Sequence, residues 1–317
     1  MVKNRAAPSV ATVKLQSKFF KGIRRSAWLY LIFALPFLYY IIFHYAPLYG
    51  IVLAFKDFQI MKGIMGSPWA GMKHINKFLF DPYFWILVRN TLLISIYGLI
   101  WGFPIPILLA ICLNEIRHRK YKKFVQNVSY LPHFISTVVV CGMIVNIMGT
   151  DGLFDQLIKL FGAAPQKWLM GPEYFRTIYI ASGVWQSAGW TSIIYLAALS
   201  MVDPELYDAA LIDGANRGQR IWYITLPAIM PTVSILFLMN LGRIMTVGYE
   251  KILLLYNGAT YETADIISTY VYRRGILQAD FSYSTAVGLF QMVISLILIV
   301  SSNQISRKIS DSETSLW

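Results

Sequence analysis

A short polar segment, residues 203–227, lies between two long apolar runs and carries four acids and two arginines. Asp203 can cap a helix there, and Pro204 suits its first position, where the missing N–H leaves no bond unmade. Gly214 stands where a left-handed residue would end that helix. A second helical turn should follow until Pro227 interrupts it. The charged side chains and the small residues of this segment would let another protein bind it and approach its backbone closely. An ordinary connector between two spans is the alternative.

The residue types and spacing of this segment resemble a known motif. Asp208-Ala209-Ala210, Asp213-Gly214-Ala215 and Leu226-Pro227 are similar to the EAA loop of permease subunits in binding-protein-dependent ABC importers. That family usually has glutamate first, where Asp208 keeps the charge with one methylene less. The resemblance implies that a cytoplasmic ATPase holds the loop in a cleft, although Asp213 has a local alternative partner in Arg217. The residues expected to couple to the ATPase are Glu205, Asp208, Ala209, Ala210, Asp213, Gly214 and Arg217.

No catalytic or metal motif accompanies this segment. The sequence contains no P-loop, nucleophile elbow or HExxH pattern. Its four histidines lack metal-ligand spacing, and Cys112 and Cys141 both fall in predicted spans, so no disulfide framework is implied. We therefore expect a non-catalytic chain that binds no cofactor and no metal. The resemblance implies that ATP and Mg²⁺ are used by the partner ATPase.

The composition predicts a membrane protein. Of 317 residues 56% are apolar, which is too many for a soluble domain of this size. Each run of 18 or more residues without Asp, Glu, Lys or Arg can form one helix across a bilayer core of about 30 Å. An all-α integral membrane protein with six transmembrane helices is predicted, and the resemblance implies the type I ABC importer permease fold. The six runs are 26–55, 90–114, 124–150, 177–202, 221–242 and 281–306.

The net charge of +12 is concentrated at predicted membrane ends. Residues 1–25 hold seven Lys and Arg and no acid, and the connector after the second span holds five. Positive charge in short connectors marks the cytoplasmic side, so both termini and the 203–227 segment are predicted to be cytoplasmic. Nucleic-acid binding is not needed to explain this charge. The apolar run after residue 25 is longer than that of a signal peptide, so residues 1–25 are expected to remain as a tail that anionic lipid attracts.

The predicted organisation has four parts. These are a basic cytoplasmic tail at 1–26, a first transmembrane helix with an outer connector at 27–85, a transmembrane core of five helices at 86–303 that contains the coupling loop 203–227, and a cytoplasmic tail at 304–317.

The outer connectors carry a second resemblance. Ala54-Phe55-Lys56-Asp57-Phe58, the stretch from Gly66 to Gly71, and the stretch from Asp265 to Gly275 resemble the polysaccharide- and oligosaccharide-type branch of the same family. The tyrosines and arginines of the last stretch suit a docking surface, because both residue types supply contact area with polar ends. An interfacial helix with an aromatic belt is the alternative.

Polar residues within the predicted spans mark a candidate pathway. The fifth span is expected to run unbroken from Pro227 past Glu250 and Lys251, which puts Arg243 and Glu250 two turns apart on one face. An ion pair that orients the helix is one interpretation, and a water-lined path is the other. The resemblance implies that this helix faces a sugar pathway. Gln186 of the fourth span is either a pathway residue or a helix–helix hydrogen bond. The candidate pathway residues are therefore Arg243, Met245, Gly248, Tyr249 and Gln186.

The resemblance implies a permease subunit in a bacterial cytoplasmic membrane. Its expected partners are a second homologous permease, a cytoplasmic dimer of ATP-binding subunits, an extracytoplasmic solute-binding protein and membrane lipid. The implied substrate is an oligo- or polysaccharide, and Arg243 would suit an acidic, uronate-containing one. A stand-alone secondary transporter or channel is the alternative, although such proteins often have two related halves and the sequence shows no second half.

Overall fold

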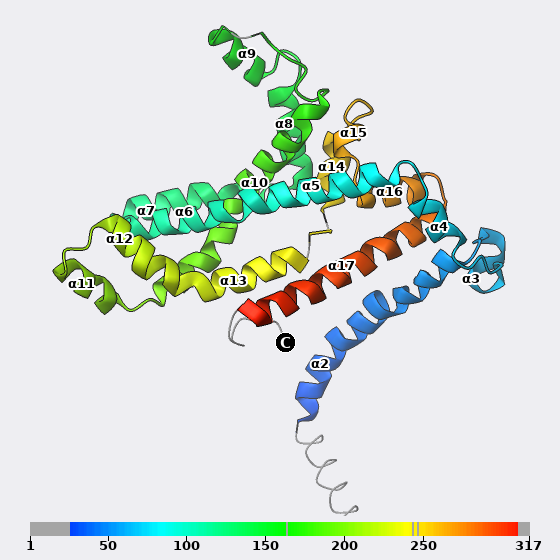
Figure 1. The fold of residues 1–317 in the computed structure, drawn as a ribbon, viewed down its shortest axis with the longest axis horizontal. Helices are drawn as coiled ribbons and strands as arrows, with labels where there is room; N and C mark the ends of the chain where they lie inside the picture. Colours follow the sequence, from blue (N-terminus) through cyan, green and yellow to red (C-terminus); the bar gives the residue numbers. More distant parts are fainter. Residues whose placement is uncertain (1–25, 163, 243, 246, 310–317) are drawn as a thin grey trace, which may run out of the picture.

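The computed structural model describes residues 26–162, 164–242, 244–245 and 247–309, and these residues are helical almost throughout (Figure 1). Among them, extended backbone pairs only at an isolated bridge between Lys56 and Trp69. The all-α prediction is confirmed for this part of the chain. The predicted basic tail, apart from Ser26, lies outside the described residues.

The first apolar run forms a helical rod that stands apart from the bundle. It consists of α2 (Ala27–Tyr40), the π-helical turn η1 (Ile41–Tyr45) and the 3-10 segment η2 (Ala46–Phe55). No residue of α2 is buried, and η2 makes the contacts with α17 (Phe281–Ile309). Figure 1 shows α2 diverging from the other helices beyond that contact. A helix that is apolar on all sides needs an apolar environment around it, which is consistent with a membrane span.

The bundle is built from long apolar helices. α5 (Phe84–Gly102) is followed by α6 (Pro104–Glu115), and α10 (Pro172–Ser200) packs along both. Pro104 starts a new helix, α6, directly after Phe103. α13 (Leu226–Gly242) packs between α10 and α17, and α8 (Thr137–Met148) packs against α14 (Tyr249–Leu255).

Shorter helical pieces connect these helices at both ends of the bundle. They are η3 (Ile60–Lys62), α3 (Gly63–Gly66), α4 (Lys73–Leu79), α7 (Arg119–Tyr130), η4 (Leu131–Phe134), α9 (Leu153–Leu160), α11 (Pro204–Ile212), α12 (Arg217–Arg220), η5 (Ile221–Thr225), α15 (Tyr261–Ala264), α16 (Ile267–Tyr272) and η6 (Arg273–Leu277).

Five helical segments of the described chain are long and apolar enough to cross a membrane. The fourth predicted span, α10, is not among them. Its 29 residues would extend about 43 Å, but its tryptophan, tyrosine, serine and glutamine side chains make it less apolar than the others. The count of six spans and the orientation of the termini therefore remain predictions. The five segments are Ala27–Phe55, Phe84–Glu115, Thr137–Leu160, Arg217–Gly242 and Phe281–Ser301.

Three clusters of buried side chains hold the bundle together. The outer cluster joins α4, α5, α16 and α17 through Phe78, Phe84, Leu87, Met245, Ile267, Tyr270, Tyr283 and Val287. The middle cluster joins α5, α8, α10 and α14 through Ile94, Cys141, Phe175, Ile252, Leu255, Ala264 and Ile266. The inner cluster joins α6, α10 and α13 through Ala110, Ile111, Tyr195, Leu199 and Ile229.

The expectation that the fifth span runs unbroken past residue 250 is wrong. α13 ends at Gly242 and α14 begins at Tyr249, after Gly248 with extended backbone. The break lets α14 pack against α8 and α16, which a straight continuation of α13 could not reach. Arg243 lies outside the described residues, and its predicted two-turn spacing from Glu250 does not hold because no helix joins the two positions.

The two stretches of the first outer connector that resemble polysaccharide-type permeases lie together. The Lys56–Trp69 bridge pairs them, and the rings of Phe55 and Trp69 stack with their centroids 5.9 Å apart. Ser282 of α17 fastens this unit to the bundle, since its Oγ donates to the Lys56 carbonyl oxygen at 2.6 Å. A hydrogen bond from Lys73 lowers the pKa of the Asp57 carboxyl.

In the last outer connector Asp265, Thr269 and Tyr270 are buried, so they do not lie on the docking surface that is one of the two interpretations of this stretch. Asp265 is fully buried and accepts hydrogen bonds from Tyr83 Oη at 3.0 Å and Thr269 Oγ1 at 2.7 Å, and it pairs with the guanidinium of Arg273. Tyr270 is buried beside it. The stretch turns inward because its charges satisfy one another inside the outer end of the bundle.

Candidate functional site

The segment 203–227 folds as its local sequence predicts at its start. Asp203 Oδ1 accepts the Glu205 backbone N–H at 2.9 Å and so caps α11. Gly214 has a φ of +80° and ends the helix: its N–H donates to the Leu211 carbonyl, and the N–H of Ala215 donates to the Ala210 carbonyl. This pair of bonds satisfies the last carbonyls of α11 and requires a left-handed residue at position 214.

The second helix of the segment departs from the prediction. Asn216 and Gln219 form a reciprocal cap, with bonds of 2.8 and 2.9 Å, and the helix then continues through Pro227 and Pro231 to Gly242. The predicted interruption at Pro227 is therefore wrong. The π-helical turn η5 stands directly before the proline and changes the bonding pattern where the proline has no N–H to donate. The end of the loop and the fifth span thus form one continuous helical segment from Arg217 to Gly242.

A partly buried hydrogen bond joins α11 to the base of that helix. Tyr207 Oη lies 3.0 Å from Thr225 Oγ1, and Thr225 is buried. A displacement of α11 is therefore transmitted to η5 and α13 through a direct contact as well as through the chain. No ion pair joins Asp213 to Arg217 within the described chain, so both charges are free to meet another molecule.

The surface of α11 is exposed and lies at one end of the bundle, beside α12 (Figure 1). Of the seven predicted coupling residues, only Ala210 is partly covered. Leu206, Leu211 and Ile212 are also 50% or more exposed. Apolar side chains interspersed with acids on an otherwise bare helix are typical of a surface that a partner protein covers.

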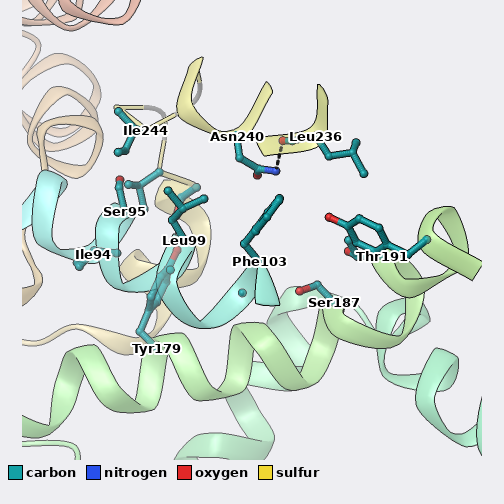
Figure 2. Close-up of a pocket in the computed structure, with 15 residues that line it drawn as sticks. Ile94, Ser95, Leu99, Phe103, Tyr179, Ser187, Thr191, Leu236, Asn240 and Ile244 are labelled. Atoms are coloured by element: carbon teal, nitrogen blue, oxygen red, sulfur yellow. Dashed lines mark hydrogen bonds between the residues drawn. The ribbon is translucent and has the colours of Figure 1, made fainter. Parts of the chain in front are cut away.

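A second feature is a pocket of about 420 Å³ between α5, α10 and α13 (Figure 2). Its volume falls in the usual range for small-molecule sites. Figure 2 shows side chains from the three helices arranged around a common space. The lining residues are Ile94, Ser95, Gly98, Leu99, Gly102, Phe103, Tyr179, Ser187, Thr191, Tyr195, Leu236, Asn240, Ile244, Val247 and Gly248.

The polar groups of this pocket are hydroxyls and one amide. Ser187 Oγ donates to the Gly183 carbonyl at 2.8 Å, and Asn240 Nδ2 donates to the Leu236 carbonyl at 2.8 Å. Both side chains keep acceptors for another partner, while Ser95 Oγ is buried without any hydrogen-bond partner. Lys251 is a cation close to one lining residue, because its Nζ lies 5.4 Å from the centroid of the Tyr179 ring. Neutral donors and acceptors beside aromatic rings suit a ligand rich in hydroxyl groups.

The predicted pathway residues are only partly brought together. Gly248 lines the pocket, but Met245 is 1% exposed and packs in the outer core cluster. The ring of Tyr249 stacks on Tyr272 with the centroids 5.9 Å apart. Gln186 donates to the carbonyl of Ile135, in the connection between η4 and α8, at 3.0 Å, so it makes a hydrogen bond to a neighbouring connector. Arg243 lies outside the described residues.

Sequence reasoning missed most of the pocket. On α10 its residues recur every four positions, at Tyr179, Ser187, Thr191 and Tyr195, with Gly183 completing the series. Residues four apart lie on one face of a helix, so this spacing was a readable signal. Other polar residues of the same span, such as Gln186, fall outside this series and obscure it.

The comparisons with known proteins agree on one family. The family described as "Binding-protein-dependent transport system inner membrane component" matches residues 102–311. The polygalacturonan/rhamnogalacturonan transport system permease protein YteP of Bacillus subtilis is 43% identical over 285 residues, covering 90% of this chain and 89% of that protein. Protein LplB of Bacillus subtilis is 39% identical over 307 residues, covering 96% of each.

Two solved structures are also similar. One is a crystal structure of a bacterial ABC transporter involved in the import of the acidic polysaccharide alginate: it is 41% identical, with a TM-score of 0.86, and the match covers 93% of this chain and 100% of that one. The other is a bacterial alginate ABC transporter in complex with a periplasmic protein that binds an alginate pentasaccharide: it is 40% identical, with a TM-score of 0.85, and the match covers 92% and 98%.

Proposed function

The chain belongs to the family of binding-protein-dependent transport system inner membrane components and is the permease of a sugar ABC importer, and from this premise we propose that its polar pocket forms part of the pathway for an acidic oligosaccharide. The proposal rests on the continuity of the helical segment Arg217–Gly242. This segment begins in the exposed coupling segment, and near its other end Leu236 and Asn240 line the pocket. A displacement of the coupling segment therefore moves a wall of the pocket.

The proposed assembly has three further kinds of subunit. A second, homologous permease would complete the pathway, and a cytoplasmic dimer of ATP-binding subunits would hold α11 of this chain. A solute-binding protein would deliver the sugar from outside, as in the alginate transporter complex. ATP and Mg²⁺ would be bound by the ATPase subunits, and this chain would be non-catalytic. The proposed location is the bacterial cytoplasmic membrane, with both termini inside.

Acidic sugars are the proposed substrate class. One relative is named for polygalacturonan and rhamnogalacturonan, and one similar structure is a transporter of alginate; both names denote uronate polymers. Uronates carry many hydroxyl groups and a carboxylate on each ring. The described pocket supplies hydrogen-bonding groups for the hydroxyls, and the carboxylate needs a cation. Arg243, next in the chain to the pocket residue Ile244, is the cation that we propose for this role.

The pocket is tested by removing its hydrogen-bonding groups. In proteoliposomes containing the complete importer, the double variant Thr191→Val and Asn240→Leu is expected to lower uptake of galacturonate oligosaccharides roughly tenfold, because each lost hydrogen bond is worth about 0.5–1.5 kcal/mol. Stimulation of ATP hydrolysis by loaded binding protein should persist. Thr177→Val makes the same threonine change on α10 outside this pocket and should leave uptake unchanged. Equal uptake by the double variant and the wild type would remove the pocket from the pathway.

The cation is tested separately in the same assay. Arg243→Gln is expected to lower uptake of acidic oligosaccharides at least roughly tenfold, because charge-assisted hydrogen bonds are about twice as strong as neutral ones. Uptake of the corresponding oligosaccharide with its carboxylates esterified should change little. If uptake of the acidic and of the esterified oligosaccharide falls equally in the variant, Arg243 stabilises the structure of the chain and does not recognise the charge of the substrate.

A further inference from the structure

A basic groove lies where α7 meets the end of α6. Its volume is about 720 Å³, and four of its lining residues are cations while none is acidic. It is distinct from the polar pocket and from the coupling surface, with which it shares no residue. The lining residues are Ile116, Arg117, Arg119, Lys122, Lys123, Gln126, Asn127 and Tyr130.

The positive charge of this groove is not neutralised within the described chain. None of Arg117, Arg119, Lys122 and Lys123 forms an ion pair or a side-chain hydrogen bond with another described residue. Glu115 is the nearest acid in the sequence and is not part of the lining. Four cations around one concave surface repel one another and focus a positive potential, which an anion would relieve.

The same helix carries an exposed apolar stripe. Tyr121, Phe124, Val128 and Leu131 are 56%, 64%, 55% and 65% exposed. Their spacing of three and four residues places Tyr121, Phe124 and Val128 on one side of α7, and Leu131 follows at the start of η4. A helix with a bare apolar side and a strongly basic side is typical of a segment at a membrane surface.

The third side of α7 faces the bundle and fixes the helix in place. A Cβ at Gly189 of α10 would lie 2.0 Å from the Ser129 carbonyl oxygen, so only glycine lets the two helices approach this closely. α7 lies toward the same end of the molecule as α11 and α12 (Figure 1), which is the cytoplasmic end in the predicted orientation. The basic groove and the apolar stripe are therefore held at the level of the inner leaflet.

We propose that this groove binds the phosphate-bearing headgroup of an anionic phospholipid of the inner leaflet, with acyl chains against the apolar stripe. The cations and the amides of Gln126 and Asn127 would donate hydrogen bonds to the phosphate oxygens. The side chains of the apolar stripe would contact the acyl chains instead of water. Clusters of cations beside a membrane helix bind anionic lipids through this combination of charge and apolar contact. The site is separate from sugar transport and would anchor the helix that follows the second span.

The test is native mass spectrometry of the assembled importer in detergent. Phosphatidylglycerol, phosphatidylcholine with the same acyl chains, and inorganic phosphate are each titrated at equal concentration. The wild type should retain phosphatidylglycerol roughly tenfold more than phosphatidylcholine, and Lys122→Gln with Lys123→Gln should lose about that preference. Lys122→Arg with Lys123→Arg should keep it, because the charge is preserved. Lys62→Gln with Lys167→Gln removes two exposed lysines of the outer connectors and should also keep it.

Two outcomes would overturn the proposal. One is a phosphatidylglycerol preference that is the same in the wild type and in the glutamine variant. The other is displacement of the bound phosphatidylglycerol by inorganic phosphate at equal concentration, since a soluble anion would then be the ligand. If the glutamine variant fails to assemble, replacing Phe124 by serine tests the apolar stripe instead, and unchanged retention there would equally contradict the site.

Discussion

Loaded binding protein is expected to stop stimulating ATP hydrolysis when Ala209 is replaced by tryptophan. Ala209 is exposed on α11, where its small side chain would let the ATPase approach the helix backbone. Large effects at the centre of a protein interface exceed about 2 kcal/mol, so the affinity of the ATPase for the permease should fall roughly 30-fold or more. The Tyr207–Thr225 contact lies on the other side of α11 and should survive, so α13 and the pocket should keep their structure.

The measurement is ATP hydrolysis by the assembled importer in nanodiscs, with and without binding protein loaded with an acidic oligosaccharide. Ala164→Trp introduces the same bulk at an exposed outer position and should leave the stimulation intact. A tryptophan at position 209 blocks the contact with the ATPase without straining the backbone. A tryptophan at position 214 would do both, because Gly214 has a φ of +80°. Full stimulation of the Ala209 variant would exclude α11 from the coupling surface.

Replacing Asp265 by asparagine is expected to lower the free energy of unfolding by about 3–5 kcal/mol. The carboxylate is fully buried, and the side chain of its partner Arg273 is only 19% exposed. Burial alone lowers the pKa of the guanidinium, but the hydrogen bond to Asp265 and its charge outweigh burial and raise that pKa above its ordinary value. Removing the carboxylate charge would leave the largely buried guanidinium of Arg273 with no opposite charge. Keeping such an unpaired charge away from water is the main energetic cost of breaking a buried ion pair.

The network around Asp265 explains why the effect should spread. Burial and the charge of Asp265 raise the pKa of Tyr83, which therefore stays protonated and donates to the carboxylate. Asn90 of α5 donates to the Asp265 carbonyl at 3.0 Å, and its own side-chain oxygen accepts from Arg176 of α10 at 2.9 Å. The outer ends of α5 and α10 and the last connector are thus joined in one set of hydrogen bonds.

Denaturation of the purified chain in detergent measures this effect. Asp151→Asn is the matched control, because Asp151 pairs with Lys159 at 2.9 Å on the surface and such exposed pairs contribute about 1 kcal/mol or less. Adding Arg273→Met to Asp265→Asn removes the orphaned cation and should restore part of the loss. If the two single asparagine variants are equally stable, the Asp265 pair is no more important than a surface contact.

Much of this protein could be predicted from short stretches of sequence. The capped start of α11 and its end at Gly214 depend on residues within a few positions of one another, so local rules sufficed. The charge-free runs could be predicted to be helical because a backbone in hydrocarbon has to satisfy its hydrogen bonds internally. The motif from Asp208 to Pro227 also identified the family, which the comparisons confirm.

The predictions fail in two kinds of place: where the backbone adjusts next to a proline, and where residues far apart in the sequence decide the structure. Pro227 was expected to end a helix, but the π-helical turn before it lets the helix continue. The stretch from Asp265 suits either a docking surface or an interfacial helix by its sequence, yet Asp265 is buried and bonds to Tyr83, which lies 182 positions away in the sequence. Met245 was placed on the pathway, but the break after Gly242 turns it into the core.

The four-residue period on α10 marks a polar face, but it does not state that this face meets α5 and α13, so the pocket does not follow from the sequence. The sequence by itself determined that the chain is helical, apolar enough for a membrane and equipped with a short capped helix between two long apolar segments. Only the tertiary structure decided which polar groups share a space, because that depends on how helices far apart in the chain pack, and packing is a property of pairs of surfaces rather than of single segments.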